Sequence, residues 1–186
     1  AGAISEGAGG VITATTLSGK SAGAPNLTGL IHVRTLGGFT AAGFGLTNAQ
    51  ALTVSGPVNG GASTTLTTTA GDLAIDGAVS GTTTTLKSAG AISEGAGGGI
   101  TANLLTGHSV GNTTLDGNNH ISTLGSFTSD FSLTNAQTLT VVGPLDGGPS
   151  VTLTTTTGDL VINGAITGTT TTLKSAGAIS EGAGGS

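Results

Sequence analysis

The chain is dominated by an internal repeat of about 88 residues. The decapeptide AGAISEGAGG occurs at 1–10, at 89–98 and at 176–185. The sequence in between also recurs, as in LTNAQALTVSGPVNGG at 46–61 and LTNAQTLTVVGPLDGG at 133–148, and in GTTTTLKS at 81–88 and 168–175. The chain therefore contains two long copies, 1–88 and 89–175, and the start of a third, 176–186. A fixed period over the whole length predicts a repeat architecture.

A shorter rhythm lies inside each long copy. Apolar segments begin at Leu52, Leu73 and Ala91, and clusters of Gly, Asn, Asp and Pro separate them. Val, Ile and Thr alternate with other residues at period two, which is typical of β-strands, and the intervening residues favour turns. A period of about 20 residues without helical spacing is typical of one coil of a β-solenoid. We therefore predict an all-β chain that forms one continuous β-solenoid over residues 1–186, with about nine coils and a length of roughly 45 Å.

The composition fits a thin core. The chain has 36 glycines, and its only aromatic residues are four phenylalanines, so we expect glycines at corners and stacked Leu, Ile and Val inside. If Leu66 and Leu86 point inward, alternation places Thr64, Thr68, Thr82 and Thr84 inside and Thr65, Thr67, Thr69, Thr83, Thr85 and Lys87 outside. The predicted inner ladders are Leu52, Val54, Leu73, Ile75 and Leu86 in the first copy and Leu139, Val141, Leu160, Ile162 and Leu173 in the second.

Charge is scarce and differs between the copies. The net charge is −5, and the four basic residues are scattered at Lys20, Arg34, Lys87 and Lys174, so we expect no nucleic-acid partner. Residues 1–88 carry three acids and three bases, residues 89–175 carry five acids and one base, and Glu181 completes the total. Two copies of similar sequence whose net charges differ by four indicate a scaffold, because a charged site repeated in every copy would need the same charges in each. No apolar run approaches the ~20 residues of a membrane span, and without cysteine the chain has no disulfide or thiolate site.

The residues that could carry chemistry do not form a known motif. Asp72 and Asp76 could suggest a cation site, but the calcium-binding nonapeptide is absent and Asn163 replaces Asp76 in the second copy, so we interpret these aspartates as turn caps. The histidines lack the spacing of a zinc site and are interpreted as surface residues: His32, His108 and His120.

Catalytic and cofactor motifs are equally missing from the sequence. No nucleophile motif occurs, and the glycine run at 95–99 is not followed by a phosphate-binding signature. We expect no catalytic residues, no metal and no cofactor. A polysaccharide-degrading solenoid enzyme, with carboxylates converging from separate coils, is the less favoured alternative because aromatic and basic residues are so few.

Regularly spaced threonines form the one surface pattern with a binding interpretation. Thr83 and Thr85 follow Thr65 and Thr67 by close to one coil, which predicts a stacked Thr-x-Thr ladder; its second-copy equivalents are Thr152, Thr154, Thr170 and Thr172. Such a flat array could bind ice or a glycan, and ice-binding solenoids resemble it. The alternative is that threonine serves only as a good strand former on a solvated face. Lys87 and the differently patterned coils at 11–49 interrupt the ladder.

The long unit resembles the repeats of large secreted bacterial exoproteins. The segments AGAISEGAGG, VITATTLSG, TLGGFTAAGFGLTNAQALTVSGPV and GDLAIDGAVSGTTTTLKSAGAISE are similar to repeat units of filamentous-haemagglutinin-like and autotransporter-type adhesins. This resemblance covers the whole chain. It implies a right-handed parallel β-helix, export to the bacterial surface or medium, and a role as adhesin shaft, extracellular fibre or biofilm matrix component. No secretion-signal domain, membrane barrel or receptor-binding module is seen, so the chain is expected to be a shaft segment.

The expected partners follow from the ends of the solenoid. Both ends carry the same AGAISEGAGG opening without a charged cap, whereas free solenoid ends normally need capping. We therefore expect self-association end to end or continuation in a longer repeat chain. Host or matrix glycans are the candidate ligands of the shaft surface.

Overall fold

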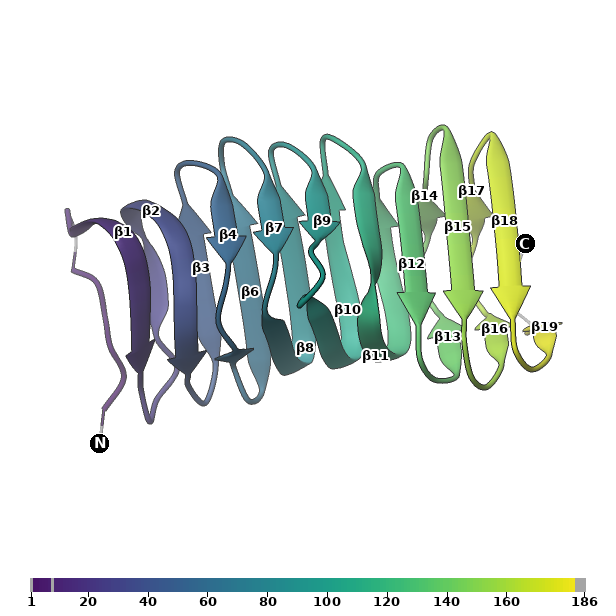
Figure 1. Ribbon diagram of the computed structural model, residues 1–186, viewed down its shortest axis with the longest axis horizontal. Helices are drawn as coiled ribbons and strands as arrows, with labels where there is room; N and C mark the ends of the chain where they lie inside the picture. Colours follow the sequence, from purple (N-terminus) through teal and green to yellow (C-terminus); the bar gives the residue numbers. More distant parts are fainter. Residues whose placement is uncertain (1, 8, 183–186) are drawn as a thin grey trace.

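The chain forms a right-handed parallel β-solenoid. The computed structural model describes residues 2–7 and 9–182, which contain 19 strands and no helix. Every strand pairing among them is parallel. In Figure 1 the chain advances from left to right while β12, β15 and β18 run downward on the near side and β14 and β17 lie on the far side, so the winding is right-handed. The predicted fold class is confirmed.

The strands follow one another around the coil with short corners between them. Those of the first copy are β1 (Val11–Lys20), β2 (Asn26–Thr40), β3 (Phe44–Asn48), β4 (Leu52–Val54), β5 (Val58–Asn59), β6 (Ser63–Thr68), β7 (Leu73–Ile75) and β8 (Ala78–Ser88). Those that follow are β9 (Ile92–Glu94), β10 (Gly99–Ser109), β11 (Thr113–Thr128), β12 (Phe131–Asn135), β13 (Leu139–Val141), β14 (Leu145–Asp146), β15 (Ser150–Thr155), β16 (Leu160–Ile162), β17 (Ile166–Thr167), β18 (Thr170–Ser175) and β19 (Ile179–Glu181).

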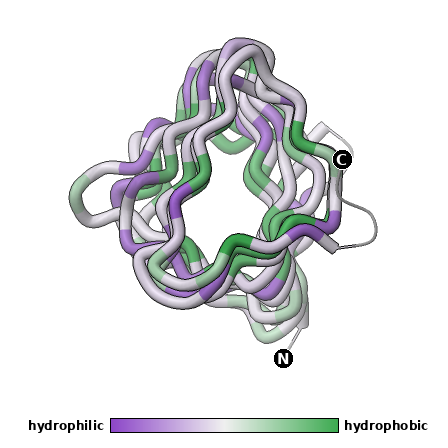
Figure 2. The backbone as a smooth tube through the Cα atoms, turned by 90° about the vertical axis from the view of Figure 1, so that its right-hand side faces the viewer, coloured by the Kyte–Doolittle hydropathy of each residue, from purple (hydrophilic) through white to green (hydrophobic). Residues whose placement is uncertain are grey.

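Equivalent positions of successive coils pair directly with one another. One column runs through Leu52, Leu73, Ile92, Thr113, Phe131, Val151 and Thr171, so six coils take up the residues from 52 to 171. Each coil therefore uses about 20 residues, and the solenoid has about nine coils, as the sequence period predicts. Seen along the axis, the coils superpose on a roughly triangular outline (Figure 2).

The two long copies are not in phase with the coils. The column of Phe44 leads through Thr64, Thr84 and Leu105 to Leu124. Phe131, the counterpart of Phe44, follows Leu124 in the chain and lies instead in the column of Leu52. The second copy is thus advanced by about a third of a coil, and Figure 1 shows β3 and β6 on the far side but β12 and β15 on the near side.

Stacked aliphatic side chains fill the interior, as predicted. Leu46, Leu66 and Leu86 pair in one ladder and are at most 1% exposed. All ten residues of the predicted inner ladders are buried except Leu173, which is half-buried because β18 belongs to the last described coil. Each fully buried aliphatic side chain stabilises the fold by about 1.5–3 kcal/mol, so a core one ladder wide can hold the rod together.

One predicted inner residue is placed wrongly. Thr64, Thr68 and Thr84 are buried as expected, but Thr82 is exposed. Val79 and Thr84 both point inward although Thr84 comes an odd number of positions after Val79, so period two cannot hold between them. A corner falls there, and the amide of Thr82 donates to the carbonyl of Gly61 in the previous coil.

The glycines form corners, as the sequence predicts, and they also allow neighbouring coils to approach closely, which the sequence does not predict. Among the described residues, five glycines have positive φ, including Gly61 at φ 56°. Others lie inside strands where coils approach closely. A Cβ at Gly107 would clash with the carbonyl oxygen of Leu86 in the preceding coil and would lie 2.9 Å from the phenyl ring of Phe127 in the next coil. The absent side chain therefore makes room for both neighbouring coils, and the Phe127 ring also packs on Phe131 with centroids 4.7 Å apart.

A buried asparagine closes one corner in each copy. Asn48 accepts a hydrogen bond from the Val33 amide (2.9 Å) and donates to the Val33 carbonyl (2.8 Å) in the preceding coil. Asn135 makes the same pair of bonds to Ile121, at 2.8 and 2.9 Å. Both asparagines are 0% exposed, so each side chain substitutes for a strand partner that the backbone lacks at the corner.

Replacing this asparagine tests its role. Asn135→Ala leaves the amide and carbonyl of Ile121 buried without a partner, which we expect to lower the free energy of unfolding by about 2–4 kcal/mol. Urea unfolding followed by circular dichroism measures the change. Gln137→Ala, which removes only an exposed hydrogen bond to Ser122, is the control and should change stability by less than about 0.5 kcal/mol. Equal losses in both variants would contradict the assigned role.

Candidate functional site

The threonines of the predicted ladder lie on the outer surface, but they stack in another register than the predicted one. Thr65 pairs with Thr85 and Thr67 pairs with Lys87, while Thr83 pairs with Ser63. The neighbour of Thr65 on the next coil is thus Thr85 rather than Thr83, because the coil continues through the corner at Gly81. In the second copy Thr152 pairs with Thr172, Thr154 with Lys174 and Thr170 with Ser150. All eight threonines of the predicted ladder are half-buried or exposed.

The outer rows that contain the first-copy threonines are short. One row contains Gly45, Thr65, Thr85 and Thr106, and the hydroxyls of Thr85 and Thr106 lie 3.3 Å apart. Its neighbour contains Thr47, Thr67, Lys87 and His108, so a cation and an imidazole follow two threonines. The second-copy threonines Thr152 and Thr172 lie on another side of the rod, in a longer outward row that also contains Thr16, Thr35, Thr53, Ala74, Ser93, Thr114 and Ser132. This row is one residue wide in the first copy, because Gly37, Ser55 and Asp76 stand two positions after Thr35, Thr53 and Ala74. The threonines therefore form one long single row and not a broad Thr-x-Thr array.

The other candidate residues lie apart from one another. The carboxylate of Asp72 accepts a hydrogen bond from the Ala91 amide (2.8 Å) in the next coil, and its counterpart Asp159 does the same for Ala178 (2.8 Å). Asp72 therefore joins the corners of successive coils. His32 and His108 are exposed or half-buried, as is His120. Among the described residues, no three His, Cys, Asp or Glu side chains come close enough to hold a metal ion.

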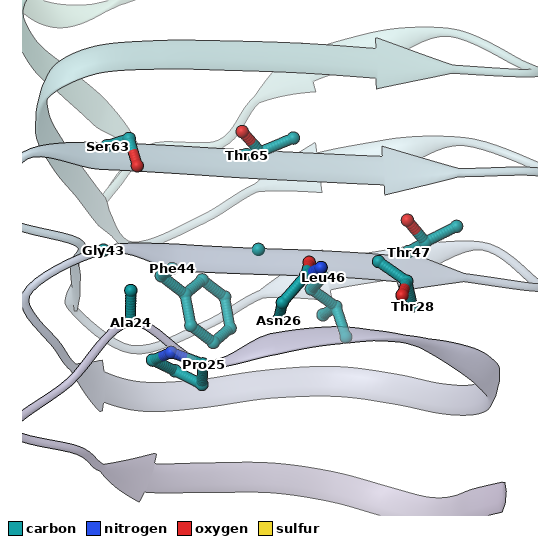
Figure 3. Close-up of a pocket in the computed structure, with 11 residues that line it drawn as sticks. Ala24, Pro25, Asn26, Thr28, Gly43, Phe44, Leu46, Thr47, Ser63 and Thr65 are labelled. Carbon is teal, nitrogen blue, oxygen red and sulfur yellow. The ribbon is translucent and has the colours of Figure 1, made fainter. Parts of the chain in front are cut away.

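A trench over β3 interrupts the threonine rows in the first copy. β3 has glycine at position 45, glycine also precedes it at 43, and the two neighbouring strands carry Asn26 on one side and Ser63 and Thr65 on the other (Figure 3). The resulting hollow, here called the β3 trench, is half-open and measures about 260 Å³. Since parallel strands are ~4.8 Å apart, the backbones of the two strands that flank it are about 10 Å apart.

The lining of the β3 trench is uncharged and combines apolar groups with hydroxyl and amide groups. The hydroxyls of Thr28, Thr47, Ser63 and Thr65 and the amide of Asn26 surround a floor of glycine backbone over Phe44. The amide oxygen of Asn26 leans over β3, since a Cβ at Gly45 would lie 2.8 Å from it. Hydroxyl and amide groups both donate and accept hydrogen bonds, so the trench suits a ligand rich in hydroxyl groups.

The second copy fills the same place with side chains. Ser132 replaces Gly45, and Asp116 replaces Thr28. The Ser132 hydroxyl donates to the Asp116 carboxylate (2.9 Å), and the Ser150 hydroxyl donates to Asp130. These groups satisfy one another, so only the first copy keeps an open trench. Sequence comparison of the copies shows the Gly45 to Ser132 difference, but not that it opens a hollow.

A half-buried glutamate from the repeated decapeptide holds the next coil. Glu94 accepts hydrogen bonds from the Gly117 amide (2.8 Å) and the Asn119 side chain (2.9 Å). Burial raises the pKa of Glu94 above its usual range, and the negative charge of Asp116 adds to this, against the lowering effect of the two hydrogen bonds. Glu6 makes the corresponding bond to the Gly29 amide (2.7 Å). This role was not predicted from the sequence, although the glutamate recurs in every decapeptide.

The raised pKa of Glu94 makes part of the stability depend on pH. For a carboxyl whose folded pKa is raised, the stabilising contribution is present below the unfolded pKa and is lost as the pH rises through the folded pKa. As the pH is lowered from about 7 to about 4, we expect the free energy of unfolding of wild type to increase relative to that of Glu94→Gln. Urea unfolding at each pH measures the two free energies. Glu181→Gln, in the same AISEG sequence but exposed, is the control and should show no such divergence. Parallel pH profiles of wild type and Glu94→Gln would be incompatible with a buried titrating group.

Comparison of the chain with protein-family models, with curated proteins and with solved structures gives no match. Function is therefore inferred from the sequence and geometry of the chain itself.

Proposed function

We propose that this chain is a shaft segment of a secreted bacterial surface adhesin or extracellular matrix fibre. The observation that supports this is the continuity of the sheet across the copy boundary at residue 88. β8 of the first copy pairs with β10 of the second through ten residue pairs, from Ala78 with Gly99 to Ser88 with Ser109. The boundary therefore has the same structure as the interior of a copy, and repetition adds length rather than a new domain.

Other features favour the same role. The copies share the buried ladders while their net charge differs by four, which suits a spacer better than an enzyme, and we propose a non-enzymatic, cell-surface or extracellular protein. No helix among the described residues is long and apolar enough to cross a membrane. End-to-end association or continuation in a longer repeat chain belongs to this proposal, since a shaft acts through its length.

Length per copy tests the shaft proposal. Adding one further copy, identical to 89–175, should lengthen the rod by about 20 Å, because four and a third coils are added at ~4.8 Å each. Small-angle X-ray scattering measures the maximum dimension. An added copy carrying Leu133→Asp, at a core position that is 0% exposed, is the control and should not extend the rod. A compact or beaded particle would refute the proposal.

A second candidate function is weak binding of a neutral glycan in the β3 trench. The trench is wide enough for one sugar ring, and its uncharged hydroxyl and amide lining matches a neutral saccharide. An extended ice-binding face is less well supported, because the one hydroxyl row that runs along the rod, from Thr16 to Thr172, is a single residue wide in the first copy and is interrupted at Ala74.

Binding in the trench can be followed at β3 itself. On titration with neutral tetrasaccharides of glucose or mannose, we expect the amide NMR signal of Gly45 to shift in wild type. Gly45→Ser introduces the residue present at position 132 and should abolish the shift of the signal at position 45. Ser132→Gly, on another side of the rod, is the control and should leave the Gly45 shift unchanged. If the Gly45 signal responds to none of these sugars at millimolar concentration, this second function is wrong.

A further inference from the structure

We propose that the outer surface around Arg34 binds a sugar that carries a single carboxylate, a hexuronate unit. The site is a hollow of about 370 Å³, here called the Arg34 hollow, whose polar lining residues are Thr13, Thr15, His32, Arg34 and Gln50. It shares no lining residue with the β3 trench. The proposal adds a binding site to the side of the rod and does not depend on the shaft role.

The pairing of β1 with β2 brings these residues together. Thr13 lies opposite His32, and the same register places Thr15 opposite Arg34. Val33, between the two basic residues, is 0% exposed, whereas His32 and Arg34 are exposed. Since side chains alternate along a strand, both basic side chains project from the side of the rod. The hollow therefore opens sideways, whatever stands at either end of the rod.

The corner after β3 supplies the remaining wall. Between paired positions, three residues of β2 face four residues of the corner at 49–52, and Gln50 of this longer segment borders the hollow beside Arg34. In the second copy, the corresponding Gln137 reaches the residue at position 122 and donates to the Ser122 hydroxyl (3.2 Å). A glutamine at this corner can thus contact a ligand held by the residue at position 34.

The hollow carries positive charge that no carboxylate of the first copy neutralises locally. Glu6 and Asp72 accept hydrogen bonds from backbone amides elsewhere, and Asp76 lies against the next coil. None of these three acids lines the hollow. The guanidinium of Arg34 is a planar fork of donors that matches a carboxylate with two parallel hydrogen bonds, so the hollow suits a carboxylate ligand.

The charge of the whole rod limits the class of anion. A net charge of −5 disfavours the approach of a polyanion such as nucleic acid, whereas one guanidinium is enough to pair with one carboxylate. The hydroxyls of Thr13 and Thr15 and the amide of Gln50 can exchange hydrogen bonds with sugar hydroxyls. A sugar with one carboxylate and several hydroxyl groups matches both parts of the lining.

The second copy keeps most of this arrangement without the guanidinium. Thr101, His120 and Gln137 repeat three of the lining residues, but Ser122 replaces Arg34 and accepts the hydrogen bond from Gln137. The two copies therefore allow the site to be removed from one place and built in the other.

Titration of the full chain with methyl β-D-glucuronide, followed by NMR, tests the site. We expect the side-chain amide signals of Gln50 to shift in wild type. Methyl β-D-glucoside, which has a hydroxymethyl group in place of the carboxylate, should bind at least about fivefold more weakly. Arg34→Ser should abolish the shift. Arg34→Lys keeps the charge but loses the fork, and should weaken binding of the glucuronide at least about threefold.

The second copy supplies the converse measurement. Ser122→Arg should give a glucuronide-dependent shift of the Gln137 side-chain signals that wild type lacks. Gly45→Ser, which fills the β3 trench, is the control and should leave the response of Gln50 unchanged. Failure of either the loss or the gain, or an equal response to the glucoside or to acetate at the same millimolar concentration, would overturn the inference. The length added per copy measures the shaft proposal separately.

Discussion

The whole structure depends on the hydrogen-bonded stacking of each coil on the next at a constant spacing. Parallel pairing places like positions on top of one another, so the interior becomes a set of ladders such as Leu46, Leu66 and Leu86. A ladder stays buried only if each coil brings the chain back to the same position around the solenoid axis. The corners therefore carry the specialised residues, and Asn48 and Asn135 use their amide groups where backbone pairing fails.

The coil period, the parallel solenoid and most inner residues could be predicted from the sequence. Burial of one side of a strand makes apolar residues alternate along it, and the stacking of coils repeats this alternation once per coil. Corners break that rule. The odd interval from Val79 to Thr84 puts Thr82 outside, and the same corner pairs Thr65 with Thr85 instead of Thr83. Asn135 and Glu94 were missed because the contacts that define their roles join residues of different coils, far apart in the sequence.

The candidate site was less predictable than the fold. Side chains at outward positions do not pack in the core, so they differ between the copies. Neither copy alone indicates which of these differences changes the surface. Gly45 in one copy and Ser132 in the other are both compatible with the strand, yet one leaves a trench and the other fills it. The effect appears only when three neighbouring strands are seen together, since the walls come from the coils before and after.

The advance of a third of a coil per copy gives the rod a helical symmetry of its own. A surface feature of one copy reappears about 21 Å further along and a third of a turn around, and it returns to its original side only after three copies, about 13 coils or roughly 60 Å. A long array of such copies would thus present each feature on three sides of the rod. A flat partner would meet a given feature only once every three copies, whereas neighbouring rods could contact one another in the same way from any of the three sides.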